Sequence, residues 1–274
     1  NTKRNRGPSG NRSRRWWFRI YWSINMQITG EQIKRYAGQI NLKKISIAGQ
    51  KKIIQSKVLI IGAGGLGTPA LTYLSRSGVS NIAIADPDKI SISNLHRQIL
   101  YDKNDLGKYK AEVAKRKILS MNPKLNIKIF KKKITKENIS VIAKQYDFIL
   151  DGTDSFKSKL EINDYCKKNK KILILGAINK FIGHLFVFNF KNKKLNSPCL
   201  RCFMPKAPDQ EENDCQSQGI IGTVAGVVGA LMANETIKEI LSFKNSICGK
   251  ILVLDLEQAS FRLINLNKNC KNHR

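Results

Sequence analysis

Residues 57–67 read KVLIIGAGGLG, and this stretch decides the fold of the chain. The first five residues form a short β-branched run typical of a buried strand, and the glycines precede a helix predicted to reach about Ser77. Glycine allows the tight turn between strand and helix, and it lets backbone N–H groups approach a phosphate at the positive end of the helix. The stretch therefore predicts a nucleotide site on an α/β sheet, with Gly62, Gly64, Gly65 and Gly67 in the turn.

The next predicted strand supplies the acidic group that such a site needs. It covers Asn81–Ala85 and ends at Asp86, which lies 19 positions beyond Gly67. An acid at this spacing can bind a ribose hydroxyl. A glycine turn can also pack a helix on a strand without any ligand, so the acid favours the nucleotide. Both NAD and ATP are compatible with this segment.

Alternating strands and helices continue along the chain. Apolar spacing predicts a helix over residues 108–121, strands near 125–130 and 147–150, and β-rich segments at 181–190 and 250–256. We therefore expect an α/β fold with a Rossmann-like, nucleotide-binding mixed sheet to about Leu175, followed by a β-rich second half.

The uncharged run from Cys215 to Asn234 approaches the length of a membrane-spanning helix. Its glycines recur three and four residues apart, which predicts one helical face stripped of side chains for close packing; they are Gly219, Gly222, Gly226 and Gly229. Charged residues continue the helix directly from Glu235. We therefore expect a buried core helix in a soluble, cytoplasmic protein without a membrane segment.

Composition excludes two classes of protein. The 274 residues are 42% hydrophobic, which excludes intrinsic disorder of the whole chain, and six cysteines are too sparse for a disulfide scaffold. The net charge of +29 suggests a nucleic-acid partner, but the lysines are spread along the whole chain rather than gathered in one stripe. We therefore regard nucleic-acid binding as an alternative function.

Residues 1–25 differ from the rest of the chain. They hold six of the thirteen arginines, all three tryptophans and no acidic residue. They have no clean apolar stretch of secretory type. We expect a basic leader that is disordered or not native, with Met26 as the natural start; a tail that binds nucleic acid is the alternative.

Three later segments decide between ATP and NAD. Residues 86–98 read DPDKISISNLHRQ, residues 107–110 read GKYK, and residues 151–154 read DGTD. Arginine and lysine neutralise phosphate charge that moves during a displacement, and a carboxylate at a strand end can hold magnesium. Each residue alone could form a surface ion pair. Together, and in this order, they favour ATP over a hydride-transfer cofactor.

From about Gln32 onward, the chain resembles the ThiF/MoeB/HesA superfamily, relatives of the ubiquitin-activating enzymes. The most specific stretches are GAGGLGTP (62–69), SNLHRQ (93–98), GKYK (107–110), DGTDS (151–155) and CLRC (199–202). The resemblance implies a single adenylation domain over residues 26–274. It also implies that the enzyme adenylates the C-terminal glycine of a ubiquitin-like sulfur carrier ending in Gly-Gly, giving an acyl-adenylate and pyrophosphate.

The resemblance also implies roles for individual residues. Nucleotide contacts would come from Gly62, Gly64, Gly65, Gly67, Asp86, Asp88, Asn94, Arg97, Gln98 and Lys110. Arg97 and Lys110 would act on the phosphates, and Asp154 would hold Mg²⁺ beside the α-phosphate. The incoming carboxylate is already ionised at neutral pH, so alignment and charge neutralisation supply most of the catalysis.

The N-terminal segment departs from this family. Arg-Tyr-x-Arg-Gln is usual, and its second arginine reaches the triphosphate in the partner subunit's site; here Gly38 takes the place of that arginine. Arg35 lies three residues earlier, which would be one helical turn away on a similar face. We expect Gly38 to lower activity and Arg35 to substitute in part.

Two cysteine motifs predict a structural zinc ion. Cys199 and Cys202 form a two-ligand knuckle, and Cys270 and His273 repeat the spacing near the end of the chain. The family commonly has a second Cys-x-x-Cys there, so His273 is a departure. A frayed chain end or a redox pair at 199 and 202 are the alternatives.

By resemblance, Cys215 lies at the position of the cysteine that some members use to form a thioester or acyl disulfide with the carrier. A helix N-terminus lowers the pKa of a thiol, which supports this role, whereas an inert loop cysteine is the alternative. We expect Cys166 and Cys248 to be ordinary buried or half-buried residues.

The preferred function is ATP-dependent adenylation of a sulfur carrier for molybdopterin or thiamine biosynthesis or tRNA thiolation, by a homodimer. The sequence does not distinguish these pathways. We expect no sulfurtransferase domain after residue 274, and therefore a separate sulfurtransferase as the sulfur donor. An NAD-dependent oxidoreductase and a non-catalytic nucleic-acid-binding module are the alternatives.

Overall fold

The computed structural model describes residues 28–195, 197–208 and 219–270. The chain divides into two compact units, residues 1–51 and 52–274. The described part of the first unit contains the helices α2 (Gly30–Arg35) and α3 (Ala37–Ile40), and α4 (Ser46–Gln55) runs from it into the second. The predicted leader, residues 1–25, and Met26 lie outside the described residues.

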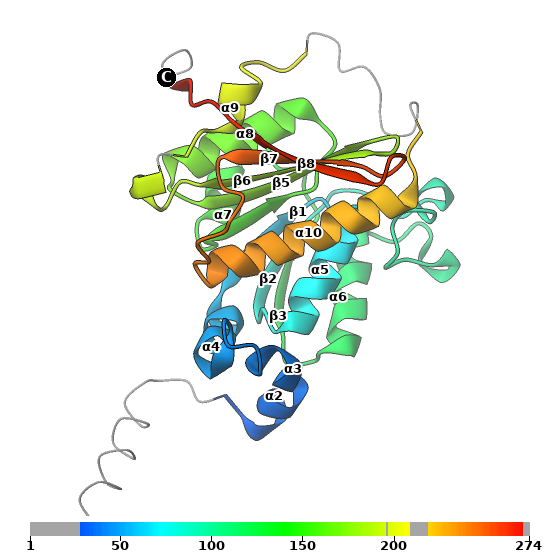
Figure 1. The fold of residues 1–274 in the computed structure, drawn as a ribbon. Helices are drawn as coiled ribbons and strands as arrows, with labels where there is room; N and C mark the ends of the chain where they lie inside the picture. Colours follow the sequence, from blue (N-terminus) through cyan, green and yellow to red (C-terminus); the bar gives the residue numbers. More distant parts are fainter. Residues whose placement is uncertain (1–27, 196, 209–218, 271–274) are drawn as a thin grey trace, which may run out of the picture. The chain divides into compact units, whose positions relative to one another are not determined.

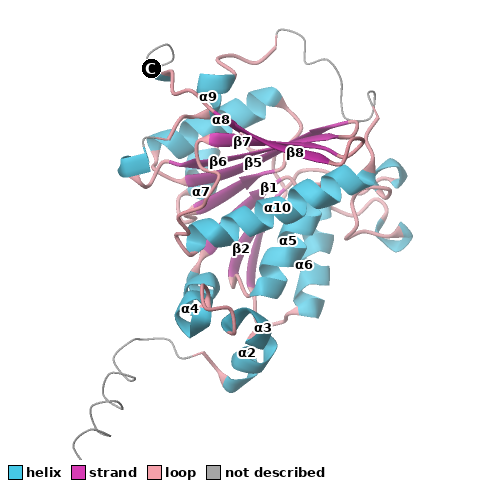
Figure 2. Ribbon diagram, viewed as in Figure 1, coloured by secondary structure: helices cyan, strands magenta, loops and turns pink. Residues whose placement is uncertain are grey.

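The second unit is built on one eight-stranded sheet (Figures 1 and 2). Its strands, in spatial order, are β3 (Asn126–Phe130), β2 (Asn81–Ala85), β1 (Lys57–Ile61), β4 (Phe148–Asp151), β5 (Ile172–Asn179), β6 (Ile182–Asn189), β7 (Lys250–Asp255) and β8 (Ser260–Asn265). The first five are parallel, and the last three are antiparallel to their neighbours. This confirms the α/β fold with a mixed sheet and a β-rich second half.

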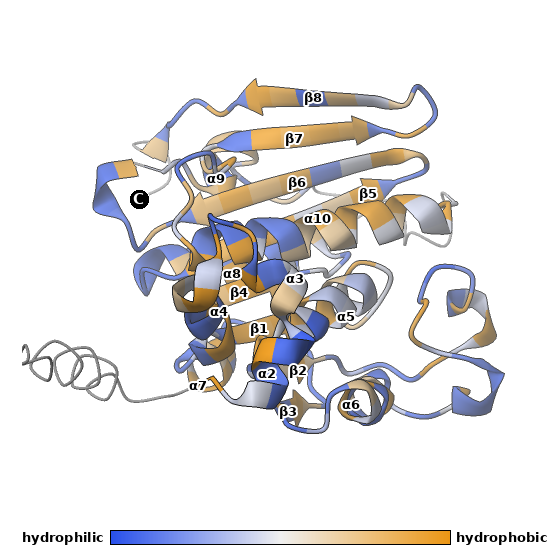
Figure 3. Cartoon of the chain, turned by 60° about the horizontal axis from the view of Figure 1, so that its bottom comes forward, coloured by the Kyte–Doolittle hydropathy of each residue, from blue (hydrophilic) through white to orange (hydrophobic). Residues whose placement is uncertain are grey.

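Helices cover both faces of the parallel strands. The helices of this unit are α5 (Gly67–Ser77), α6 (Lys110–Met121), α7 (Ile139–Ala143), α8 (Phe156–Lys168), α9 (Leu200–Phe203) and α10 (Gly222–Ile240). In Figure 2, α5, α6 and α10 lie on one face of the sheet, and α7 and α8 lie on the other. A parallel strand with both faces covered is apolar throughout. Because helices cover both faces of β1, four of its five residues are buried. Figure 3 shows mainly apolar colours on the strands.

Helix α10 corrects two details of the sequence analysis. It begins at Gly222, so Gly219 precedes it instead of sharing its face, and Gly219 has a φ of +74°. A Cβ at Gly229 would lie 2.4 Å from Pro69 Cγ, which confirms close packing there, but a Cβ at Gly226 would have nothing within 4 Å.

In the part of the chain that the structure describes, no helix combines the length and the apolar character needed to cross a bilayer.

The break between α2 and α3 corrects a third detail. Tyr36 ends one helix and begins the next, with ψ at 15°, so Arg35 and Gly38 lie on separate short helices. The expectation that Arg35 lies one helical turn below Gly38 is therefore wrong.

Candidate functional site

A cavity of about 900 Å³ opens at the carboxyl ends of β1, β2, β4 and β5. The chain leaves β1 toward β2 on one side and reaches β4 and β5 on the other, which makes this the topological switch point of the sheet. The lining includes the predicted residues Gly62, Gly64, Gly65, Asp86, Asp88, Asn94, Arg97, Gln98, Lys110 and Asp154. Segments far apart in the sequence therefore meet in one pocket.

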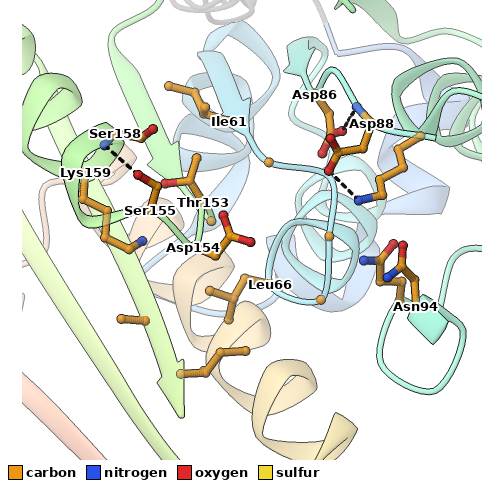
Figure 4. Close-up of a pocket in the computed structure, with 18 of the residues that line it drawn as sticks. Ile61, Leu66, Asp86, Asp88, Asn94, Thr153, Asp154, Ser155, Ser158 and Lys159 are labelled. Carbon is orange, nitrogen blue, oxygen red and sulfur yellow. Dashed lines mark hydrogen bonds and ion pairs between the residues drawn. The ribbon is translucent and has the colours of Figure 1, made fainter. Parts of the chain in front are cut away.

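Figure 4 shows two groups of polar side chains in this pocket. Asp86, Asp88 and Asn94 lie on one side of the glycine turn, and Asp154 and Lys159 lie on the other. A ligand seated over the turn would contact both groups.

Close packing, as well as ligand binding, requires glycine at positions in the turn. Gly62 has a φ of +88°, and a Cβ there would lie 2.9 Å from the carbonyl carbon of Gly152. A Cβ on Gly67 would lie 1.9 Å from the carbonyl oxygen of Gly62. Gly67 does not line the cavity, because it begins α5 behind the turn. The positive end of α5 therefore faces the cavity across a turn that accepts no larger residue at these positions.

Asp86 supports the glycine turn directly. Its Oδ2 accepts a hydrogen bond from the Ala63 amide at 2.7 Å, and its Oδ1 accepts one from the Asp88 amide at 2.8 Å. Burial raises the pKa of this carboxyl group, and Lys110 and the two amides oppose the rise. Asp86, the residue predicted to bind the ribose, is thus held in place by two backbone amides.

The cationic and amide groups lie beside Asp88 and the glycine turn. Lys110 Nζ is 2.9 Å from Asp88 Oδ2, and Arg97 donates from Nη1 to the Ser93 carbonyl at 3.1 Å. Gln98 is buried, and among the described residues its Oε1 has no hydrogen-bond partner. A buried amide oxygen without a partner has unused capacity to accept a hydrogen bond from a ligand.

Asp154 is an exposed carboxylate just before α8. Within the described ranges it forms no hydrogen bond or ion pair. Mg²⁺ is usually held by one or two carboxylates together with substrate phosphates, so Asp154, which lines the cavity, has the chemistry of the predicted metal ligand.

Sequence reasoning missed two supporting residues. The Tyr101 hydroxyl donates to the Ala63 carbonyl at 2.8 Å and also lies 3.2 Å from the Lys110 carbonyl, and burial raises its pKa. Lys159 on α8 is 3% exposed, lines the cavity and is 3.6 Å from Asp151. In the sequence, Lys159 is distinguished only by its spacing: it lies on the same helical face as the apolar Ile162 and Cys166.

Three of the four predicted zinc ligands meet away from the cavity. The Sγ atoms of Cys199, Cys202 and Cys270 lie 3.4, 3.9 and 4.0 Å apart in pairs. Tetrahedral zinc with Zn–S bonds of about 2.3 Å requires sulfur atoms about 3.8 Å apart, so the cluster fits the ion. Burial raises the pKa of the Cys199 thiol to about 11, and Lys167 Nζ lies 3.7 Å from its sulfur.

Other predicted residues lie outside the cavity or outside the described part of the chain. His273 and Cys215 belong to segments that the structure does not describe. Cys166 is fully buried and Cys248 is half-buried, as expected.

Comparison with known proteins gives one family. Residues 36–273 match the ThiF family. A "Probable molybdopterin-synthase adenylyltransferase" of Porphyra purpurea is 42% identical over 84% of this chain and 60% of its own length. A "Sulfur carrier protein adenylyltransferase" of Thermus thermophilus is 35% identical over 89% of this chain and 91% of its own length. This chain thus spans less than two thirds of the Porphyra relative but most of the Thermus one.

Solved structures support the fold. The crystal structure of E. coli MccB with ATP superposes with a TM-score of 0.71, at 21% identity, over 90% of this chain and 81% of that one. The structure of PaaA gives the same TM-score at 21% identity over 89% of this chain and 86% of its own.

Proposed function

Because the chain belongs to the ThiF family, we propose that it adenylates the C-terminal glycine of a small ubiquitin-like sulfur carrier, using ATP. The names of the Porphyra and Thermus relatives support this substrate class. The chain spans most of the length of the Thermus relative.

One observation carries the proposal: a single cavity holds a glycine turn, cations and the exposed carboxylate of Asp154, all from separate segments. The turn and Asp86 suit a ribose and its phosphates. Arg97 and Lys110 suit a triphosphate, because each can neutralise charge that moves onto the leaving pyrophosphate. A nicotinamide cofactor has no comparable use for this set, which disfavours the NAD-dependent oxidoreductase.

The reaction needs positioning more than a strong base. A carboxylate oxygen of the carrier attacks the α-phosphorus, the bond from this phosphorus to the bridging β-oxygen breaks, and its electron pair leaves with pyrophosphate. Asp154 would hold the magnesium ion, which supplies charge neutralisation at the phosphates. Asn94 and Gln98 would orient the nucleotide by hydrogen bonds.

A second cavity of about 580 Å³ offers a route for the carrier's C-terminal peptide. It shares Gly219 and Ile220 with the first cavity and extends along His96, Phe181 and Ile221. Gly-Gly is the least bulky C-terminal sequence, so it suits a route that passes Gly219 and Ile220 to the nucleotide. The active form would be a homodimer, zinc would stabilise the cysteine cluster, and a separate sulfurtransferase would supply the sulfur.

The test combines the purified chain with ATP, Mg²⁺ and candidate carriers, and follows carrier-adenylate by mass spectrometry and ATP–pyrophosphate exchange. We expect a carrier product heavier by one AMP, and no product with the same carrier lacking its last glycine. Lys110→Met should abolish the product.

Two outcomes would contradict the proposal. One is the absence of adenylate with every Gly-Gly carrier while NAD binds the cavity and displaces ATP. The other is strong, salt-sensitive binding of DNA or RNA that competes with ATP, which would favour the nucleic-acid-binding module. Filter binding at low and high salt measures the second.

A further inference from the structure

A buried ion pair lies behind the turn that carries Asp154. Lys159 Nζ is 3.6 Å from Asp151 Oδ1, and the two side chains are 4% and 0% exposed. Asp151 is the last residue of β4, and Lys159 lies near the start of α8. The short segment from 152 to 155 connects the two elements and forms part of the cavity wall.

The carboxylate of Asp151 organises this segment. Its Oδ1 accepts hydrogen bonds from the Thr153 amide at 2.9 Å and from the Thr153 hydroxyl at 2.7 Å. Its Oδ2 is buried and has no hydrogen-bond partner within the described ranges. A buried carboxylate with few partners is costly unless a cation lies nearby. Lys159 is the cation that balances this charge.

Lys159 also links the segment to the next strand. Its Nζ donates to the Gly176 carbonyl of β5 at 2.9 Å. Gly176 is itself closely packed, because a Cβ there would lie 2.7 Å from Met232 Sδ. One ammonium group therefore joins α8, the end of β4 and the body of β5, and it does so at the cavity wall (Figure 4).

We propose that Lys159 is a positioning residue for adenylation, which acts through Asp151 and Thr153 to fix Asp154 against the nucleotide. The inference rests on the proposed function, because Asp154 is placed there as the ligand of the magnesium that accompanies ATP. Lys159 does not need to contact the nucleotide in this role. Its importance comes from the turn that its charge supports.

The test uses Lys159→Met, which keeps the length of the side chain and removes the charge. Lys168→Met is the matched control, because this lysine lies on the same helix and is exposed. We expect Lys159→Met to lower kcat of ATP–pyrophosphate exchange by about 10- to 100-fold, the range for a misplaced catalytic group, with the KM for the carrier unchanged. Lys168→Met should match the wild type.

The double variant Asp151→Asn/Lys159→Met separates positioning from direct contact. The amide oxygen of the introduced asparagine can still accept both hydrogen bonds from Thr153. Residues 151 and 159 together carry no net charge in the wild type, and they carry none in the double variant. We expect the double variant to recover most of the lost kcat. This variant also remains informative if Lys159→Met alone fails to fold, because it leaves no unbalanced buried charge.

Calorimetry of ATP binding, without any carrier, provides a readout besides activity. In Lys159→Met we expect the gain in ATP affinity that Mg²⁺ provides to shrink, and the affinity without Mg²⁺ to stay at the wild-type value. A weaker affinity without Mg²⁺, or a double variant as slow as Lys159→Met, would overturn the inference in favour of direct contact. A wild type that binds Mg²⁺ and ATP but adenylates no carrier would overturn the proposed function only, and calorimetry would still test Lys159.

Discussion

The ammonium group of Lys110 lies 2.9 Å from the carboxylate of Asp88, with side-chain exposures of 8% and 60%. Lys110 is the buried partner and lines the cavity, so the exposed carboxylate occupies a position where a phosphate would compete with it. An ion pair with an exposed partner contributes at most about 1 kcal/mol. A phosphate group can therefore displace Asp88 from Lys110 at little cost.

The family resemblance implies that Asp88 contacts the nucleotide, but its carboxylate is paired with Lys110, so Asp88→Asn should strengthen ATP binding. The substitution keeps the backbone amide that donates to Asp86 and removes one negative charge beside the phosphates. We expect the Kd for ATP to fall by up to about fivefold, the equivalent of about 1 kcal/mol, and the effect to shrink at high salt. Calorimetry at two salt concentrations measures both. Asp102→Asn is the control, because Asp102 pairs with Lys117 and does not line the cavity; weaker ATP binding in Asp88→Asn would contradict the argument.

The glycines of α10 provide a matched pair for stability. A Cβ at Gly229 would lie 2.5 Å from the Leu66 carbonyl oxygen, whereas a Cβ at Gly226 would meet nothing within 4 Å. Alanine is about 0.5–1 kcal/mol better than glycine inside a helix. Gly226→Ala should therefore raise the free energy of unfolding by about this amount, and Gly229→Ala should lower it by about 1–3 kcal/mol through overpacking. Urea denaturation measures both, and equal effects of the two variants would refute this account.

Local patterns in the sequence predicted most of the fold. The strand at residues 57–61 and the turn after it were predictable because β-branched residues and glycines favour particular backbone conformations at their own positions. The break at Tyr36 was not, because a helix-compatible sequence continues through it. The start of α10 at Gly222 was missed because nothing in the uncharged run marks a boundary.

The candidate site divides in the same way. Asp86, Arg97 and Lys110 were predicted because they belong to compact motifs. Tyr101 and Lys159 were not, since each donates to a backbone carbonyl far away in the sequence, and a carbonyl is present whatever the residue type. Contacts of this kind can be found only in the folded chain.

The cysteine cluster should hold about one zinc ion per chain. We expect Cys202→Ser to lose the metal and to lower the Tm, because a structural zinc site contributes directly to folding. Cys248→Ser is the control, since its sulfur does not belong to the cluster. Elemental analysis and thermal unfolding with and without a chelator provide the measurements. Purified wild-type protein with a zinc content near zero would remove the ion from this account.

Gly38 takes the place of the arginine that the family motif predicts. Gly38 is exposed, and a Cβ there would have no atom within 4 Å, so the first carbon of an introduced side chain displaces nothing. If a cation at this position neutralises triphosphate charge, Gly38→Arg should raise the rate of ATP–pyrophosphate exchange by about 10-fold or more, since one such group is commonly worth about 100-fold.

Gly30→Arg is the matched control for Gly38→Arg. Gly30 is equally open, and the substitution adds the same charge to the first unit at a position outside the motif. An equal gain in both variants would indicate a general electrostatic effect, which high salt would screen. An unchanged exchange rate in Gly38→Arg would mean that the missing arginine does not limit this enzyme. Arg35→Met would then show whether Arg35, on its separate helix, supplies the charge instead: a rate close to zero in that variant is the expected result if it does.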